Sequence, residues 1–144
     1  MNVAELSGFT FMYLCNFEGA LAPKSFDMAG RTGPLHATGI GKALLSGMTD
    51  AQVDEYFAQA PQRFTPHTIV DREAMQLALD ETRSRGYSTE IEELAFGRAC
   101  IAAPIRNRAG EIVAGISASG PLSVLDLHAP HQELALQLIE AADE

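Results

Sequence analysis

The sequence predicts an α+β fold in which helices pack against an antiparallel sheet. Segments with strand character are grouped together rather than alternating regularly with helices, and two of them flank a short turn. Between the strand groups lie segments that begin with helix-capping residues. With 47% apolar residues in 144, the chain has enough apolar surface for one core. We therefore expect one domain over residues 1–144.

The first half of the chain is expected to contribute one strand and two helices. Residues 9–17 are rich in aromatic residues and alternate partially, which favours a strand. Residues 22–34 carry two prolines and two glycines, which indicates an irregular loop. Thr38 is a suitable N-cap for a first helix, and Thr49 begins a second one that stops before Pro61.

A longer helix is predicted in the middle of the chain. Asp71 is positioned to cap a helix from Arg72 to Arg85, and Gly86 stands where a C-terminal glycine belongs. Apolar residues recur through this segment, including Leu77, and form an imperfect stripe.

The remaining segments are expected to form most of the sheet and a last helix. Residues 87–91 and 100–105 favour strands, and a turn at 107–110 leads into a returning strand over 111–119. Apolar spacing within residues 130–142 predicts an amphipathic helix.

The charge of the chain weighs against direct contact with nucleic acid. Nineteen acidic and ten basic residues give a net charge of −9, which phosphate backbones repel. No apolar run reaches the ~18 residues that span a membrane, and no signal peptide is recognisable. We expect a cytoplasmic protein without a membrane partner.

No cofactor or metal is expected. The two cysteines, Cys15 and Cys100, lack CxxC spacing, and the four histidines show no ligand spacing with them. The TGIGKA segment, residues 38–43, partly matches a phosphate-binding loop, but its glycines are too close together and alanine follows Lys42.

Two clusters of polar residues are candidates for chemistry. Glu90, Glu92 and Glu93 could supply paired carboxylates, although three neighbouring glutamates more often form a solvated face or cap nearby backbone. On the predicted hairpin, Ser117 and Ser119 share one face of a strand, with Cys100 on the partner strand. If this face points inward, it offers polar anchors in an apolar pocket. Strand serines that face solvent are the simpler alternative.

Four segments occur in an order and at spacings that resemble the C-terminal domain of IclR-family transcriptional regulators of bacteria. They are PLHATGIGKALLSGM, FTPHTIVD, RSRGYSTEIEELAFGRACIAAPI and NRAGEIVAGISASGP, and the resemblance is strongest from Gly33 to Pro121. It implies a GAF-like (profilin-like) fold, a curved antiparallel sheet with helices on both sides. In such regulators a winged helix–turn–helix domain binds DNA. Only eight residues precede Phe9, so we expect that domain to be absent here and DNA to be a partner only through it.

The resemblance also implies a small-molecule site. Carried over residue by residue, it comprises Gly39, Ile40, Glu90, Cys100, Ser117 and Ser119. Relatives commonly have aspartate at the position of Glu90 and a smaller residue at that of Ile40, so the pocket here is expected to be narrower. An apolar wall is expected from Met12, Leu21, Phe26 and Met28.

The function implied by the resemblance is effector sensing rather than catalysis. The effector is expected to be an organic or aromatic acid, and self-association to a homodimer or homotetramer is expected. Two alternatives remain open. One is a redox or acyl-transfer enzyme that uses Cys100, which requires a lowered thiol pKa. The other is a dimerisation module whose pocket is filled by Ile40.

Overall fold

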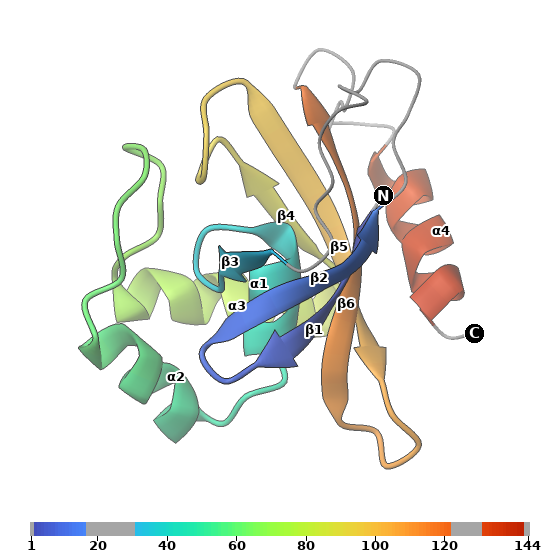
Figure 1. Cartoon of the computed structure of the whole chain (residues 1–144), viewed down its shortest axis with the longest axis horizontal. Coiled ribbons are helices and arrows are strands. Elements are labelled where there is room, and N and C mark those ends of the chain that lie inside the picture. The colour runs from blue at the N-terminus through green and yellow to red at the C-terminus, as the bar shows by residue number, and fades with distance from the viewer. Residues whose placement is uncertain (1, 17–30, 122–130, 143–144) are drawn as a thin grey trace.

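The computed structural model describes residues 2–16, 31–121 and 131–142. Within these residues, six strands form one curled antiparallel sheet in the order β3-β2-β1-β6-β5-β4 (Figure 1). The strands are β1 (Asn2–Ser7), β2 (Thr10–Asn16), β3 (Thr32–Pro34), β4 (Ser88–Ile91), β5 (Arg98–Arg106) and β6 (Ile112–Pro121). The helices are α1 (Gly39–Leu45), α2 (Asp50–Ala58), α3 (Arg72–Arg85) and α4 (His131–Ala142).

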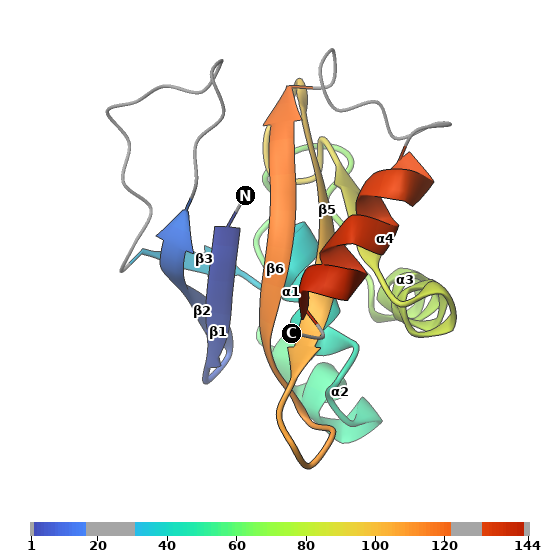
Figure 2. The same cartoon turned by 90° about the vertical axis from the view of Figure 1, so that its right-hand side faces the viewer.

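Helices cover both faces of this sheet, as predicted. On one face, α1 packs on β5 and β6, and residues from α2 and α3, such as Val53 and Leu79, join the same core as Ala102. On the other face, Leu138 of α4 packs against Ile101 and Ile116. Figure 2 shows α4 lying across β5 and β6. Ala102 and Ile101 belong to different cores because alternate strand residues face opposite sides.

The first half of the chain follows the prediction except at its strands. The predicted strand over 9–17 is β2, which β1 precedes through a turn at Gly8, where φ is +63°. The sequence prediction missed β1, whose mixed pattern NVAELS does not alternate clearly. It pairs with β2 through that turn on one side and with β6, more than a hundred residues later, on the other. Part of the predicted loop, residues 32–34, is the short edge strand β3, and residues 22–30 lie outside the described residues.

The helix signals of the sequence are confirmed. The Thr38 hydroxyl accepts from the Gly41 amide, Thr49 forms a capping box with Gln52, and Asp71 caps α3. Gly86 ends α3 in the left-handed conformation, with φ of +88°. The predicted apolar stripe of α3 is wrong at one position.

Leu77 does not belong to that stripe. Its side chain is 72% exposed, whereas Met75, Leu79 and Thr82 of the same helix are buried. These three positions recur at helical spacing, and Leu77 points away from them.

Gly41→Ala should destabilise the domain by about 1–3 kcal/mol or more, because a Cβ at this position would overlap the backbone of Leu35, which cannot move aside as a side chain can. Gly120→Ala is the matched control, since a Cβ there meets nothing within 4 Å. Chemical denaturation of both variants measures the difference. Equal stabilities would show that α1 does not need this close approach.

Candidate functional site

The register of the sheet brings four of the six sequence-predicted residues together. Glu90 of β4 pairs with Cys100 of β5, which pairs with Ser119 of β6. In the adjacent row, Ala102 pairs with Ser117. Cys100 and Ala102 are two residues apart on β5, so the two rows lie on the same face of the sheet. This is the face that α1 covers, because Ala102 packs in the core shared with α1. The strand pairing therefore forms a line of carboxyl, thiol and hydroxyl groups across three strands.

The other two predicted residues lie at the start of α1 and play different parts. A Cβ on Gly39 would stand 2.7 Å from the Cys100 sulfur, so the backbone of Gly39 lies directly against the thiol. The Ser88 hydroxyl donates to the Gly39 carbonyl at 2.5 Å and fastens the helix start to β4. Ile40 is buried in the core and approaches Gly115. Its side chain packs against β6, so only its backbone belongs with the polar line.

The two serines differ in exposure although they share a face. Ser117 is 2% exposed, whereas Ser119, two residues further along β6, is exposed. The buried Ser117 hydroxyl lies beside the Cys100 thiol and lowers the pKa of that thiol. Ser119 is therefore the serine whose hydroxyl remains available to a molecule from solvent.

The Cys100 thiol is buried and stays protonated at neutral pH. Burial raises its pKa to about 12, and the neighbouring Glu90 carboxylate raises it too, against the opposing effect of hydrogen bonds from Ser117 and Gly39. Nucleophilic cysteines require the opposite shift. The thiol is thus suited to packing and weak hydrogen bonding.

Glu90 is a buried carboxyl whose pKa is raised above its ordinary value. It is 5% exposed, and one of its oxygens accepts from the Glu93 amide at 2.9 Å. Burial raises its pKa to about 7, with a further increase from the charge of Glu93, while the Glu93 amide, Lys42 and Arg98 oppose the shift. Glu90 and Glu93 are buried, so they do not form a solvated face; they cap nearby backbone, the other expectation, since they accept from the amides of Glu93 and Ile91.

A buried ion pair between Lys42 and Glu93 lies next to Glu90. The Lys42 ammonium lies 2.6 Å and 2.8 Å from the two carboxylate oxygens of Glu93, and it donates to the Thr89 carbonyl at 2.8 Å. Lys42 is only 4% exposed. Its two hydrogen bonds, to Thr89 and to Oε2 of Glu93, join α1 to the end of β4 and the segment after it. Sequence analysis noted Lys42 but did not foresee its partner.

Tyr13 of β2 is a member of this cluster that sequence analysis missed. Burial raises its pKa to about 12, and nearby Cys100 and Glu90 raise it further, which sets the phenol close to both. Met12, predicted to line the site, pairs with Glu5 and lies on the opposite face from Tyr13. The remaining residues of the predicted apolar wall, Leu21, Phe26 and Met28, lie outside the described residues.

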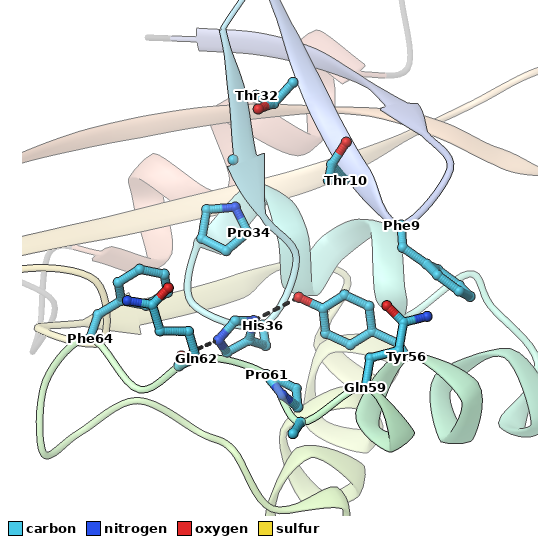
Figure 3. Close-up of a pocket in the computed structure, with 12 residues that line it drawn as sticks. Phe9, Thr10, Thr32, Pro34, His36, Tyr56, Gln59, Pro61, Gln62 and Phe64 are labelled. Atoms are coloured by element: carbon cyan, nitrogen blue, oxygen red, sulfur yellow. Dashed lines mark hydrogen bonds between the residues drawn. The ribbon is translucent and has the colours of Figure 1, made fainter.

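A separate pocket of about 420 Å³ opens between the β1–β2 turn, β3 and the end of α2 (Figure 3). His36 forms its floor: its Nε2 lies 2.7 Å from the Gln62 carbonyl and its Nδ1 lies 2.6 Å from the Tyr56 hydroxyl. Because a carbonyl only accepts, Nε2 carries the proton, and Tyr56 donates to Nδ1. Burial lowers the pKa of His36. Both ring nitrogens are thus occupied, and none of the six predicted site residues lines this pocket.

Neither a metal site nor a membrane span occurs in the described part of the chain. Groups of three or more histidine, cysteine, aspartate or glutamate side chains with suitable geometry are absent among residues 2–16, 31–121 and 131–142. Every helix within these ranges is too short or too polar to cross a bilayer.

The fold, a curled antiparallel sheet with helices on both faces, is that of the C-terminal domain of a bacterial transcriptional regulator. The family described as "Bacterial transcriptional regulator IclR C-terminal" matches residues 1–144, and this chain belongs to that family. It is the effector-binding domain of an IclR-type regulator, which confirms the resemblance seen in the sequence.

Similar proteins agree with this assignment. The HTH-type transcriptional regulator XynR of Escherichia coli K12 is 35% identical over 122 residues, which are 84% of this chain and 48% of XynR. The repressor AllR of Klebsiella pneumoniae is 48% identical over 93 residues, 64% of this chain and 34% of AllR. An IclR homologue from Microbacterium hydrocarbonoxydans, solved in complex with 4-hydroxybenzoate, superposes with a TM-score of 0.84 at 25% identity, covering 98% of this chain and 56% of that one. The chain spans about half the length of XynR.

Glu90→Gln should change how stability depends on pH. A carboxyl whose pKa is higher in the folded than in the unfolded chain stabilises the fold below the unfolded value of about 4.3, and this stabilisation disappears as pH rises through the folded value of about 7. Relative to Glu90→Gln, the native domain should therefore lose up to ~1.4 kcal/mol per pH unit across this window. Thermal unfolding from pH 4.5 to 8 measures it, and parallel curves would contradict the shift.

Lys42→Met should destabilise the domain by about 3–5 kcal/mol, because it leaves the Glu93 carboxylate buried without its cation. Adding Glu93→Gln to this variant removes the unpaired charge and should restore part of the loss. Urea denaturation of the single and double variants tests both statements. A double variant less stable than the single one would mean that Glu93 acts through contacts other than the ion pair.

Proposed function

We propose that this domain senses a small organic or aromatic monocarboxylic acid at the polar line formed by Glu90, Cys100 and Ser119. The observation that carries the proposal is the convergence of these groups with the Gly39 backbone on one face of the sheet. A few polar groups in an otherwise apolar setting are typical of small-molecule sites. The complex of the Microbacterium homologue with 4-hydroxybenzoate supports an acid as the class of effector.

Each residue of the proposed site has a distinct part. The backbone amide of Ile40 and the exposed Ser119 hydroxyl donate to the carboxylate of the acid, because the Gly39 amide is directed to the Cys100 thiol. Ser117 lies beside that thiol, and the thiol packs beside the ligand. The amide of Gly41 is not available, because the Thr38 hydroxyl already accepts from it at 2.9 Å.

Tyr13 and Glu90 limit what else the ligand carries. The protonated phenol of Tyr13 donates to or accepts from a polar substituent of the acid. A second anionic group on the ligand is disfavoured, since Glu90 already brings one buried carboxyl to the site and like charges there repel each other strongly. The site is accordingly matched to monoanions.

Binding is transmitted to DNA through another part of the regulator. The acid shifts the equilibrium between arrangements of a homodimer or homotetramer in the bacterial cytoplasm, and winged helix–turn–helix domains outside this chain respond to that shift. Only a difference in affinity between the two arrangements moves the equilibrium. The net charge of −9 fits a domain that does not itself contact DNA.

The two alternative functions fit the site less well. The raised pKa of Cys100 keeps the thiol protonated, which weighs against a catalytic nucleophile. Ile40 packs against Gly115 of β6, so its side chain occupies the core and does not fill the space over Ser119.

A thermal-shift screen against small carboxylic acids, hydroxybenzoates included, tests the proposed function. At a hundredfold excess over Kd, an acid that binds only the folded domain stabilises it by about 2.7 kcal/mol. Ser119→Ala should reduce this shift, because it removes an exposed donor of the site. Ser84→Ala, an exposed serine on α3, is the matched control and should retain the shift. No stabilisation by any acid would contradict an acid-sensing site.

A further inference from the structure

The charged groups around Glu90 do not compensate a second negative charge beside it. Glu90 faces Cys100 and Arg98 from β5, Tyr13 from β2, Lys42 from α1 and Glu93 from the segment after β4. Two of these neighbours, the thiol and the phenol, are uncharged at neutral pH because their pKa values are raised. Glu93 adds a negative charge, so only Lys42 and Arg98 oppose the charge of Glu90.

Neither cation is free to neutralise Glu90. The Lys42 ammonium hydrogen-bonds one carboxylate oxygen of Glu93 and the Thr89 carbonyl, and it lies 2.6 Å from the other Glu93 oxygen, so its charge is paired with Glu93. Arg98 is exposed at the start of β5, where solvent and salt screen its charge. The Glu90 carboxyl itself is 5% exposed and has a single described hydrogen bond, from the Glu93 amide.

A carboxylate ligand beside an ionised Glu90 would place two negative charges in a desolvated site without an available counter-ion. One of the two groups must then hold a proton, as in other sites where carboxyl groups share a small space. The ligand carboxylate has the Ile40 amide and the Ser119 hydroxyl as donors, whereas Glu90 has only one amide. The proton therefore resides on Glu90 rather than on the ligand carboxylate.

Resting on the proposed function, we propose that a carboxylate ligand enters this site together with one proton from solvent, and that the proton resides on Glu90. The protonated carboxyl then donates an O–H···O hydrogen bond to the ligand, a charge-assisted bond that an ionised glutamate could not form. The overall step is uptake of one anion and one proton, which leaves the charge of the site unchanged. Effector sensing by this domain is in consequence also sensitive to pH.

The direction of the pH dependence follows from the free domain. Below pH 7 the free Glu90 is mostly protonated, so binding needs no further proton and the affinity is nearly constant. Above pH 7 the binding-competent fraction falls tenfold for each pH unit, and the apparent affinity falls with it. Between pH 6 and pH 8 this amounts to about tenfold weaker binding, given the titration of Glu90 near 7.

Isothermal titration calorimetry with 4-hydroxybenzoate and with lactate, at pH 6 and pH 8, tests the inference. Wild-type protein should bind at least one of the two acids about tenfold more weakly at pH 8 than at pH 6. At pH 8, titrations in buffers of different ionisation enthalpy should show uptake of close to one proton per ligand. Glu90→Gln should abolish both effects and should bind more tightly than wild type at pH 8. Glu55→Gln, on the exposed face of α2, should behave as wild type.

Each remaining outcome overturns a defined statement. Binding of equal strength at both pH values overturns the proton-linked inference and leaves the acid-sensing function intact. Proton uptake that persists in Glu90→Gln overturns the assignment to Glu90. Absence of binding of both acids to wild type at either pH, together with a negative screen, overturns the proposed function itself. If Glu90→Gln does not fold, a carbon-13 NMR titration of the glutamate carboxyls of the wild type replaces it. Titrations with and without 4-hydroxybenzoate show whether the ligand raises the pH at which Glu90 is half protonated.

An unchanged midpoint of the Glu90 titration overturns the inference.

Discussion

The close approach of α1 to the sheet is the constraint on which the site depends. Gly39 lies against the Cys100 sulfur and Gly41 lies against the backbone of Leu35, and neither position has space for a Cβ. Each glycine lowers helix propensity by about 1 kcal/mol relative to alanine, but its lack of a side chain allows α1 to contact the sheet closely. Tertiary packing of α1 on β5 and β6 compensates, since most of the stability of a short helix comes from packing.

This approach also explains how a lysine comes to be buried. Lys42 lies one turn into α1, and the helix carries its ammonium beneath the end of β4, where Glu93 and Thr89 receive it. The Glu93 amide then donates to Glu90. A continuous chain of contacts thus runs from α1 through a buried ion pair to the carboxyl that faces Cys100. Such a chain joins the proposed ligand site to the segment that follows β4, whose Leu94 and Phe96 side chains are exposed.

Local signals predicted the parts of this fold that local physics controls. Caps at Thr38, Thr49 and Asp71 act within three residues, and the hairpin of β5 and β6 closes through a short turn, so both were visible in the sequence. That hairpin placed Cys100 on the strand beside Ser119, and the structure supplied the register that pairs them. Strand β1 was missed because NVAELS does not alternate clearly, and one of its two partners, β6, lies at the other end of the chain.

What the sequence by itself determined is therefore the class of fold, the helix boundaries, the family and the identity of the polar residues on one hairpin. Only the tertiary structure decided which of them are buried and what they meet. Glu90 and Glu93 looked like a solvated pair, and Tyr13 looked like one aromatic residue among several. Their titration and partners depend on burial beneath α1 and on a bulge between β1 and β2, and these are set by contacts between residues distant in the chain. Residue spacing records local geometry, whereas desolvation is a property of the packed molecule.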